Sequence, residues 1–334
     1  MQELSQLLIP TADSIERPGK ALDDKTNTSF EGRLMRKIKE QCNDFYSYQG
    51  IFVATPSGQL LAGTHHDARD VRKVEKLLRA GLEKWQTISR GDRLMTQDMF
   101  SEAGAELAKE KGRSKYPAGG LVLSVICRDL PLANPKDFKG GEVHRKMYNQ
   151  DYAWFQKSEV RGFLPAQLTK GARQKVPRDL VARLARFHFV DLVRGHTSSY
   201  PEKAVERADL TAEVIEVKDH LVSLGYSGRT RTSEVHEGVH IEGKWNPPGR
   251  GIPKLQKRGV DARLEGHAIY DQNAEQFVAF NVVVVSQRWG GNVYNARAQF
   301  LDFGPAPMGF VIELAGDNAA EQIPPLFFRS YKWK

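Results

Sequence analysis

The clearest candidates for chemistry are the histidines of the segment SEVHEGVHIEG. His236 and His240 are four positions apart, so their side chains share one face on a strand or on a helix. Glu234 and Glu242 fall on the same even-numbered positions. Imidazole and carboxylate groups are ligands of zinc and non-haem iron sites, so a metal site at His236 and His240 is one hypothesis. The solvent-exposed face of a strand shows the same alternation and is the simpler explanation.

A second candidate lies between Arg288 and Gly309, where four glycines and two prolines interrupt apolar strands. Four residues there are candidate ligand-binding residues: Arg288, Trp289, Tyr294 and Arg297. Aromatic side chains at the mouth of a pocket, with arginines beside them, would suit a small acidic ligand. The alternative interpretation is a packed irregular loop that covers the edge of a sheet.

The proline- and glycine-rich segment GKWNPPGRGIPKLQKRG is a candidate anion-binding loop. Its cations include Lys244, Arg250, Lys257 and Arg258, and they lie near Trp245, so phosphate binding with base stacking is conceivable. The alternative is an exposed loop that charge keeps soluble. A net charge of +8 over 334 residues permits acidic partners but is moderate, so nucleic-acid binding is the less favoured interpretation.

A third set of polar residues recurs on a helix expected near residues 177–195. His188, Asp191 and Arg194 are three positions apart, and a carboxylate beside a histidine can set its tautomer and raise its pKa. No nucleophile accompanies them, which favours a structural ladder on the helix flank. Glycine motifs of serine hydrolases, phosphate-binding loops and dinucleotide sites do not occur in the sequence.

The N-terminal part shows a regular order of expected elements. An apolar strand is expected over residues 7–13, and the capping-box pair Thr28 and Glu31 predicts the start of a helix. Two apolar runs flank Thr55-Pro56-Ser57-Gly58, which predicts a β-hairpin. Asp67 is expected to cap a second amphipathic helix that extends to Trp85.

This order, with LLIPTAD as an inner strand and GIFVATPSGQLLAG as an antiparallel pair, resembles the later part of a thioredoxin-like fold over residues 7–87. The resemblance implies a scaffold for thiol chemistry, yet only six residues precede Leu7, which is too few for the strand and Cys-x-x-Cys helix of that family. Tyr48-Gln49-Gly50 also stands where the family has its cis-proline. We therefore expect an incomplete module, either inert or preceded by further chain.

The cysteines agree with an inert module. Cys42 and Cys127 are the two cysteines of the chain, and they form no Cys-x-x-Cys pair. Cys42 is expected near the C-terminal end of its helix, where the helix dipole disfavours a thiolate. Thiol-redox activity through Cys42 is therefore the less favoured hypothesis.

The remaining sequence predicts an α+β protein. After the thioredoxin-like module, residues 1–90, we expect a helical linker over residues 91–120. A β-rich antiparallel domain, a barrel or sandwich with a helical insert near 177–195, should occupy residues 121–334. Its hairpin turns are expected at Lys218-Asp219 and at Gln272-Asn273-Ala274.

The leading functional prediction is a non-catalytic binding or interaction module with a protein partner or a small acidic ligand, and without a cofactor. No apolar run reaches the roughly 18 residues of a membrane span, and no signal peptide is recognisable. We therefore expect a cytoplasmic protein, or an extracytoplasmic one if the true start lies upstream. The alternative function is an enzyme that uses Cys42 for thiol chemistry or His236 and His240 for a metal.

Overall fold

The computed structural model describes residues 40–41, 51–64, 70–99, 101, 116–237, 255–291, 295, 297, 300–317 and 321–333. The chain divides into two compact units, Met1–Lys115 and Tyr116–Lys334. The division falls inside the segment that was expected to link two domains. Among the described residues, no helix is both long enough and apolar enough to cross a membrane.

The first unit contains the expected β-hairpin, which is confirmed. Strands β1 (Ile51–Ala54) and β2 (Leu60–Thr64) pair in antiparallel fashion. The turn closes where the amide of Gly58 donates to the carbonyl of Thr55 at 2.9 Å. Gly58 has a φ of 86°, a left-handed conformation that glycine adopts without steric cost.

Helix α4 (Val71–Thr87) follows the hairpin, and a short helix, α5 (Arg90–Arg93), comes next. The carboxylate of Asp70 caps α4 by accepting hydrogen bonds from the amides of Arg72 and Lys73. The predicted cap, Asp67, is therefore wrong, because a capping residue directly precedes the first turn and α4 begins at Val71. Residues 7–13 and Cys42 lie outside the described residues, so the thioredoxin-like resemblance stays a prediction.

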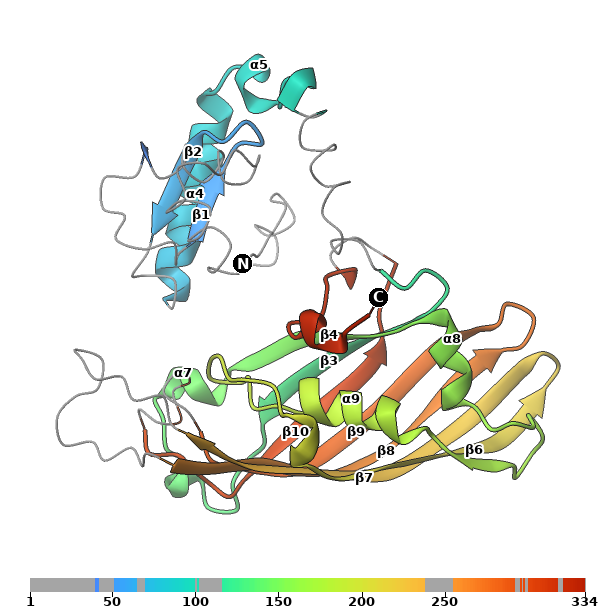
Figure 1. The fold of residues 1–334 in the computed structure, drawn as a ribbon. Helices are drawn as coiled ribbons and strands as arrows, with labels where there is room; N and C mark the ends of the chain where they lie inside the picture. Colours follow the sequence, from blue (N-terminus) through green and yellow to red (C-terminus); the bar gives the residue numbers. More distant parts are fainter. Residues whose placement is uncertain are drawn as a thin grey trace. The chain divides into compact units, whose positions relative to one another are not determined.

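The second unit is built on one eight-stranded antiparallel sheet in the order β4-β3-β10-β9-β8-β7-β6-β5 (Figure 1). The strands are β3 (Leu121–Asp129), β4 (Tyr148–Phe155), β5 (Arg173–Lys175), β6 (Val205–Lys218), β7 (Leu221–Glu237), β8 (Leu255–Asp271), β9 (Gln276–Trp289) and β10 (Ala306–Leu314). The α+β, β-rich class is confirmed, but the expected barrel or sandwich is wrong. The sheet stays open at β4 and β5, and helices rather than a second sheet cover its apolar face.

The turns explain how the strands come into register. Lys218 pairs with Leu221, so the β6–β7 turn is Asp219-His220, one residue later than expected, and Asp219 takes the positive φ of 53°. The β8–β9 turn lies where it was expected, and the carboxylate of Asp271 accepts hydrogen bonds from two of its amides.

Helix α9 (Arg178–Phe187) lies on the inner face of the sheet and packs on β6 and β7 (Figure 1). Leu180, Val181 and Leu184 of α9 are buried in the same cluster as alternate residues of the strands. Short helical turns lie between the strands, namely η1 (Pro135–Asp137), α7 (Glu142–Arg145), α8 (Lys157–Val160), η2 (Arg161–Phe163) and η3 (Glu202–Ala204), and one more, η5 (Phe328–Tyr331), follows β10. The opposite face, called the outer face below, carries the intervening side chains, as in sheets with one solvated face.

Candidate functional site

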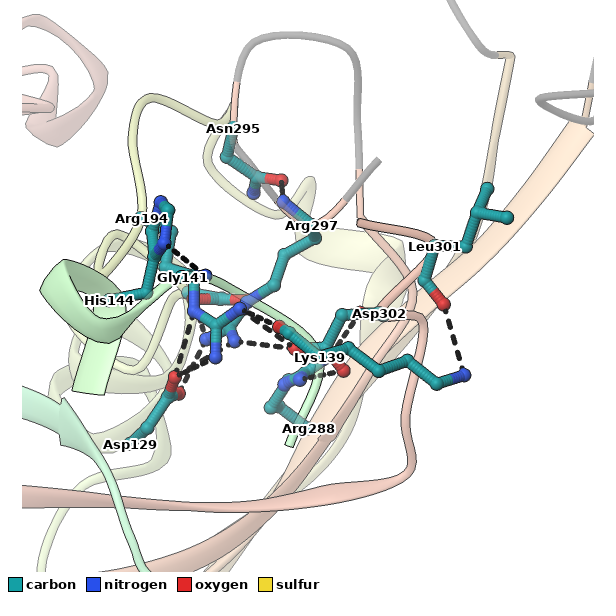
Figure 2. A network of polar contacts seen from close by, with 11 residues as sticks. Asp129, Lys139, Gly141, His144, Arg194, Arg288, Asn295, Arg297, Leu301 and Asp302 are labelled. Atoms are coloured by element: carbon teal, nitrogen blue, oxygen red, sulfur yellow. Dashed lines mark hydrogen bonds and ion pairs between the residues drawn. The ribbon is translucent and has the colours of Figure 1, made fainter. Parts of the chain in front are cut away.

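A network of buried charges lies at the end of the sheet where β3 and β9 finish (Figure 2). It contains three arginines and three aspartates: Arg194, Arg288, Arg297, Asp129, Asp191 and Asp302. These residues come from β3, from the segment after α9, from the end of β9 and from the segment before β10. We call this set the buried charge network.

Arg297 is the centre of the network, and its side chain is 0% exposed. Its Nε and Nη2 donate to the two carboxylate oxygens of Asp191 at 2.9 and 3.0 Å. Its Nη1 and Nη2 donate to Asp129 at 2.9 and 2.5 Å, and Nη1 also reaches Asp302 at 2.9 Å. The planar guanidinium therefore binds three carboxylates at once, two of them through paired contacts.

The other two arginines complete the network. Arg194 donates from Nε and Nη2 to Asp129 at 3.0 and 2.8 Å, and its Nη1 donates to the carbonyl of Lys139 at 2.5 Å. Arg288 contacts Asp302 twice, through the carboxylate at 2.7 Å and through the carbonyl at 2.6 Å. The network thereby joins segments that are far apart in the sequence.

Three positive and three negative groups make the buried charge network neutral. Burial alone would raise the pKa of Asp129, but the hydrogen bonds and charges of Arg297 and Arg194 lower it below its ordinary value. The pKa of Asp302 is lowered in the same way: burial alone would raise it, and the hydrogen bond and charge of Arg288 contribute most to lowering it. Both carboxylates are therefore held in the ionised form, as partners of the arginines.

This geometry differs from the pocket that was expected around Arg288, Trp289, Tyr294 and Arg297. Arg288 and Arg297 are buried and already bound to carboxylates, so they do not line an open pocket mouth. Trp289 lies elsewhere, on the outer face beneath the guanidinium of Arg231 at 5.3 Å. Tyr294 lies outside the described residues. The structure does not bring Arg288, Trp289 and Arg297 together around one ligand.

The set His188, Asp191 and Arg194 does not lie on one helix, because α9 ends at Phe187. Asp191 and Arg194 enter the buried charge network instead. The imidazole of His188 bridges Asp151, at 3.0 Å from Nδ1, and the hydroxyl of Tyr331, at 2.5 Å from Nε2.

Arg258 was expected to bind anions with Lys244, Arg250 and Lys257. Its side chain is instead buried, with Nε donating to Glu234 at 2.7 Å and Nη1 donating to the hydroxyl of Thr197 at 2.7 Å. The expectation of a free cation at this position is therefore corrected, because a carboxylate already neutralises it. Lys257 is exposed, and the other two lie outside the described residues.

The predicted metal and thiol residues fall largely outside the described residues. Nothing is described for the side chain of His236, for His240 or for Cys42, while Glu234 pairs with Arg258. In the part of the chain that the structure describes, no group of three or more histidine, cysteine, aspartate or glutamate residues could hold a metal ion. Cys127 is buried, and burial with the nearby charge of Asp191 raises the pKa of its thiol to about 12.

The outer face carries features that the sequence reasoning missed. The strand register places Val311 of β10 directly between Ile126 of β3 and Val283 of β9, and Val285 follows two residues later. Val283 and Val285 are each 55% exposed. We call Ile126, Val283, Val285 and Val311 the apolar stripe.

Next to the apolar stripe, two shallow hollows of about 430 and 260 Å³ lie over β6 to β9, and Arg229 and Arg263 line both. These two arginines are direct neighbours across β7 and β8. The alternation of arginine and threonine in GRTRT could have predicted these outward-facing arginines. Thr230 and Thr232 are buried, while Arg229 and Arg231 point outward.

Comparison with known proteins gives no relative: no protein-family model, no curated protein and no solved structure matches the chain.

Proposed function

We propose that the chain is a non-catalytic binding module that holds a partner protein against the outer face of the sheet in its second unit. The observation that carries the proposal is the apolar stripe. Its members lie side by side on three neighbouring strands, β3, β10 and β9. Contiguous apolar groups that stay exposed are typical of interaction surfaces.

Charge next to the stripe suggests the chemistry of the partner. Arg263 of β8 is the direct neighbour of Val285, and Arg229 of β7 lies next along the same row. A surface with apolar side chains at its centre and carboxylates at one side would complement this pattern. The proposed partner is therefore a protein that presents apolar residues bordered by acidic ones.

The inner side of the sheet supports a binding role through rigidity. The strands that carry the stripe bury Val282, Val284, Phe310 and Ile312 on their other face. The buried charge network then holds the loops at one end of β3 and β9. A platform ordered before binding loses less conformational entropy when it binds.

The experiment compares two threonine variants of β9. Val283→Thr with Val285→Thr keeps side-chain shape and strand propensity but makes the stripe polar. Val278→Thr is the matched control, because Val278 is 45% exposed on the same strand but lies outside the stripe. Partners retained from an extract of the source cells by the wild-type chain are identified, purified and titrated by calorimetry.

The proposal expects an identified partner whose affinity falls about tenfold or more in the double variant, as for loss of central apolar contacts. The Val278→Thr control should bind like the wild type. Equal affinities for all three chains would show that the stripe is not the binding surface. Concentration-dependent self-association that disappears in the double variant would instead identify a second copy of this chain as the partner.

A further inference from the structure

The larger hollow on the outer face gathers three arginines. Arg207 of β6, Arg229 of β7 and Arg263 of β8 line it, together with the hydroxyl-bearing Ser227. Two carboxylates, Asp209 and Glu265, also line it. The groups that line this hollow therefore have one positive charge in excess.

The two carboxylates hold their arginines loosely. Arg207 and Asp209 are 3.8 Å apart with side chains 52% and 60% exposed, and Arg263 and Glu265 are 3.6 Å apart with side chains 68% and 75% exposed. Exposed ion pairs of this length contribute little to stability. The guanidiniums of Arg207 and Arg263 can therefore bind another anion at a small cost in free energy.

Arg229 is held even less. Among the described residues it forms no ion pair, although it lies between two charged neighbours, Asp209 of β6 and the like-charged Arg263 of β8. Like charges directly opposite each other destabilise a sheet. Arg231 on the same strand shows the contrast, because Glu206 and Asp261 both contact it at 2.7 Å. The carboxylate of Asp209 pairs with Arg207 instead, so the guanidinium of Arg229 remains available to an external anion that would also reduce its repulsion with Arg263.

We propose that this hollow binds a small multivalent oxyanion, one that carries phosphate or carboxylate groups, between Arg229 and Arg263. Paired N–H groups of a guanidinium match two oxygens of such an anion. Ser227 supplies a further donor, and Arg207 supplies the third positive charge. A hollow of about 430 Å³ has room for a molecule of this class. The inference rests on the proposed function in taking the outer face as the binding face.

The test is calorimetric titration of the full chain with inorganic pyrophosphate and, separately, with citrate, at constant ionic strength. Arg229→Gln and Arg263→Gln each remove one guanidinium from the hollow. Arg128→Gln is the matched control, because Arg128 is exposed on the outer face of β3, lies outside both hollows and changes the net charge equally. Loss of a charge-assisted contact should weaken binding about tenfold or more.

The expected result is saturable binding of at least one anion, weakened in the two hollow variants and changed less than twofold in Arg128→Gln. Binding of pyrophosphate alone identifies a phosphate site, and binding of citrate alone identifies a carboxylate site. Equal weakening in all three variants, or no binding at millimolar anion, would overturn the proposal. Thermal unfolding without anion checks that both hollow variants fold like the wild type.

The partner-protein proposal and the oxyanion proposal can be refuted independently of each other. The Val283→Thr, Val285→Thr variant should keep pyrophosphate or citrate binding, because it leaves Arg229 and Arg263 unchanged. Anion binding without a protein partner would therefore leave the oxyanion site standing while the partner proposal falls.

Discussion

Replacing Arg297 with methionine is the sharpest perturbation of the buried charge network. Arg297 is fully buried, and within the described residues it is the ion-pair partner of Asp191. Its loss leaves Asp191, 13% exposed, as an unpaired buried carboxylate. Removing one partner of a buried ion pair typically costs about 3–5 kcal/mol, so Arg297→Met should reduce the free energy of unfolding by that amount.

Such a loss should lower the melting temperature by about 6–20 °C, since 1 kcal/mol corresponds to about 2–4 °C in a domain of roughly 200 residues. Calorimetry and urea unfolding of the full chain measure the change. Arg128→Met, at an exposed position, is the control and should stay within about 0.5 kcal/mol of the wild type.

A double-mutant cycle separates the lost packing of Arg297 from the unpaired charge that it leaves. In the chain with both Arg297→Met and Asp191→Asn, two arginines and two aspartates of the network remain, so it is neutral again. The double variant should therefore recover about 1–3 kcal/mol relative to the sum of the single changes. A cost below about 1 kcal/mol for Arg297→Met, or strict additivity in the cycle, would refute a structural role for these charges.

Three further predictions concern the pH dependence of stability, the thiol of Cys127 and the cap of α4. Asp129 and Asp302 have lowered pKa values in the folded chain, so the stability that they contribute is complete above the ordinary pKa of about 3.9 and is lost as the pH falls through their folded pKa values. The urea concentration at the unfolding midpoint should therefore fall between pH 6 and pH 2, and a constant midpoint would contradict this prediction. In a Cys42→Ser chain, the buried thiol of Cys127 should resist a thiol reagent at pH 8 until urea unfolds it, and rapid labelling of the folded chain would contradict its burial. Asp70→Ala should destabilise α4 by about 1 kcal/mol through loss of the cap, and this is measured as faster amide exchange in the first turn. Unchanged exchange would show that Asp70 does not cap the helix.

Elements held together by local interactions were predictable from the sequence. The hairpin turn at Thr55–Gly58 depends on four adjacent residues, and the long strands β6 to β9 follow from period-two alternation. The start of α4 was misplaced by three residues, because Asp67 and Asp70 are both good capping residues and sequence alone does not choose between them.

The run of four valines at residues 282–285 is a segment whose buried face the sequence pattern does not predict. Every residue of the run is equally apolar, so nothing in it says which side chains face the core. Packing against α9 and the neighbouring strands buries Val282 and Val284 and leaves Val283 and Val285 exposed. The apolar stripe therefore became visible once the register across β3, β10 and β9 was known.

Sequence patterns predict the β-rich class, the hairpins and the long strands β6 to β9, because these depend on hydrogen bonds and side-chain periods within short segments. That the sheet is open, and that Arg297 binds Asp129, 168 positions away, rather than a ligand, follows from the packing of distant segments. The same packing also places Arg229 opposite Arg263. Ion pairs and like-charge neighbours depend on which strands lie side by side, and that choice is made by burial of the whole core.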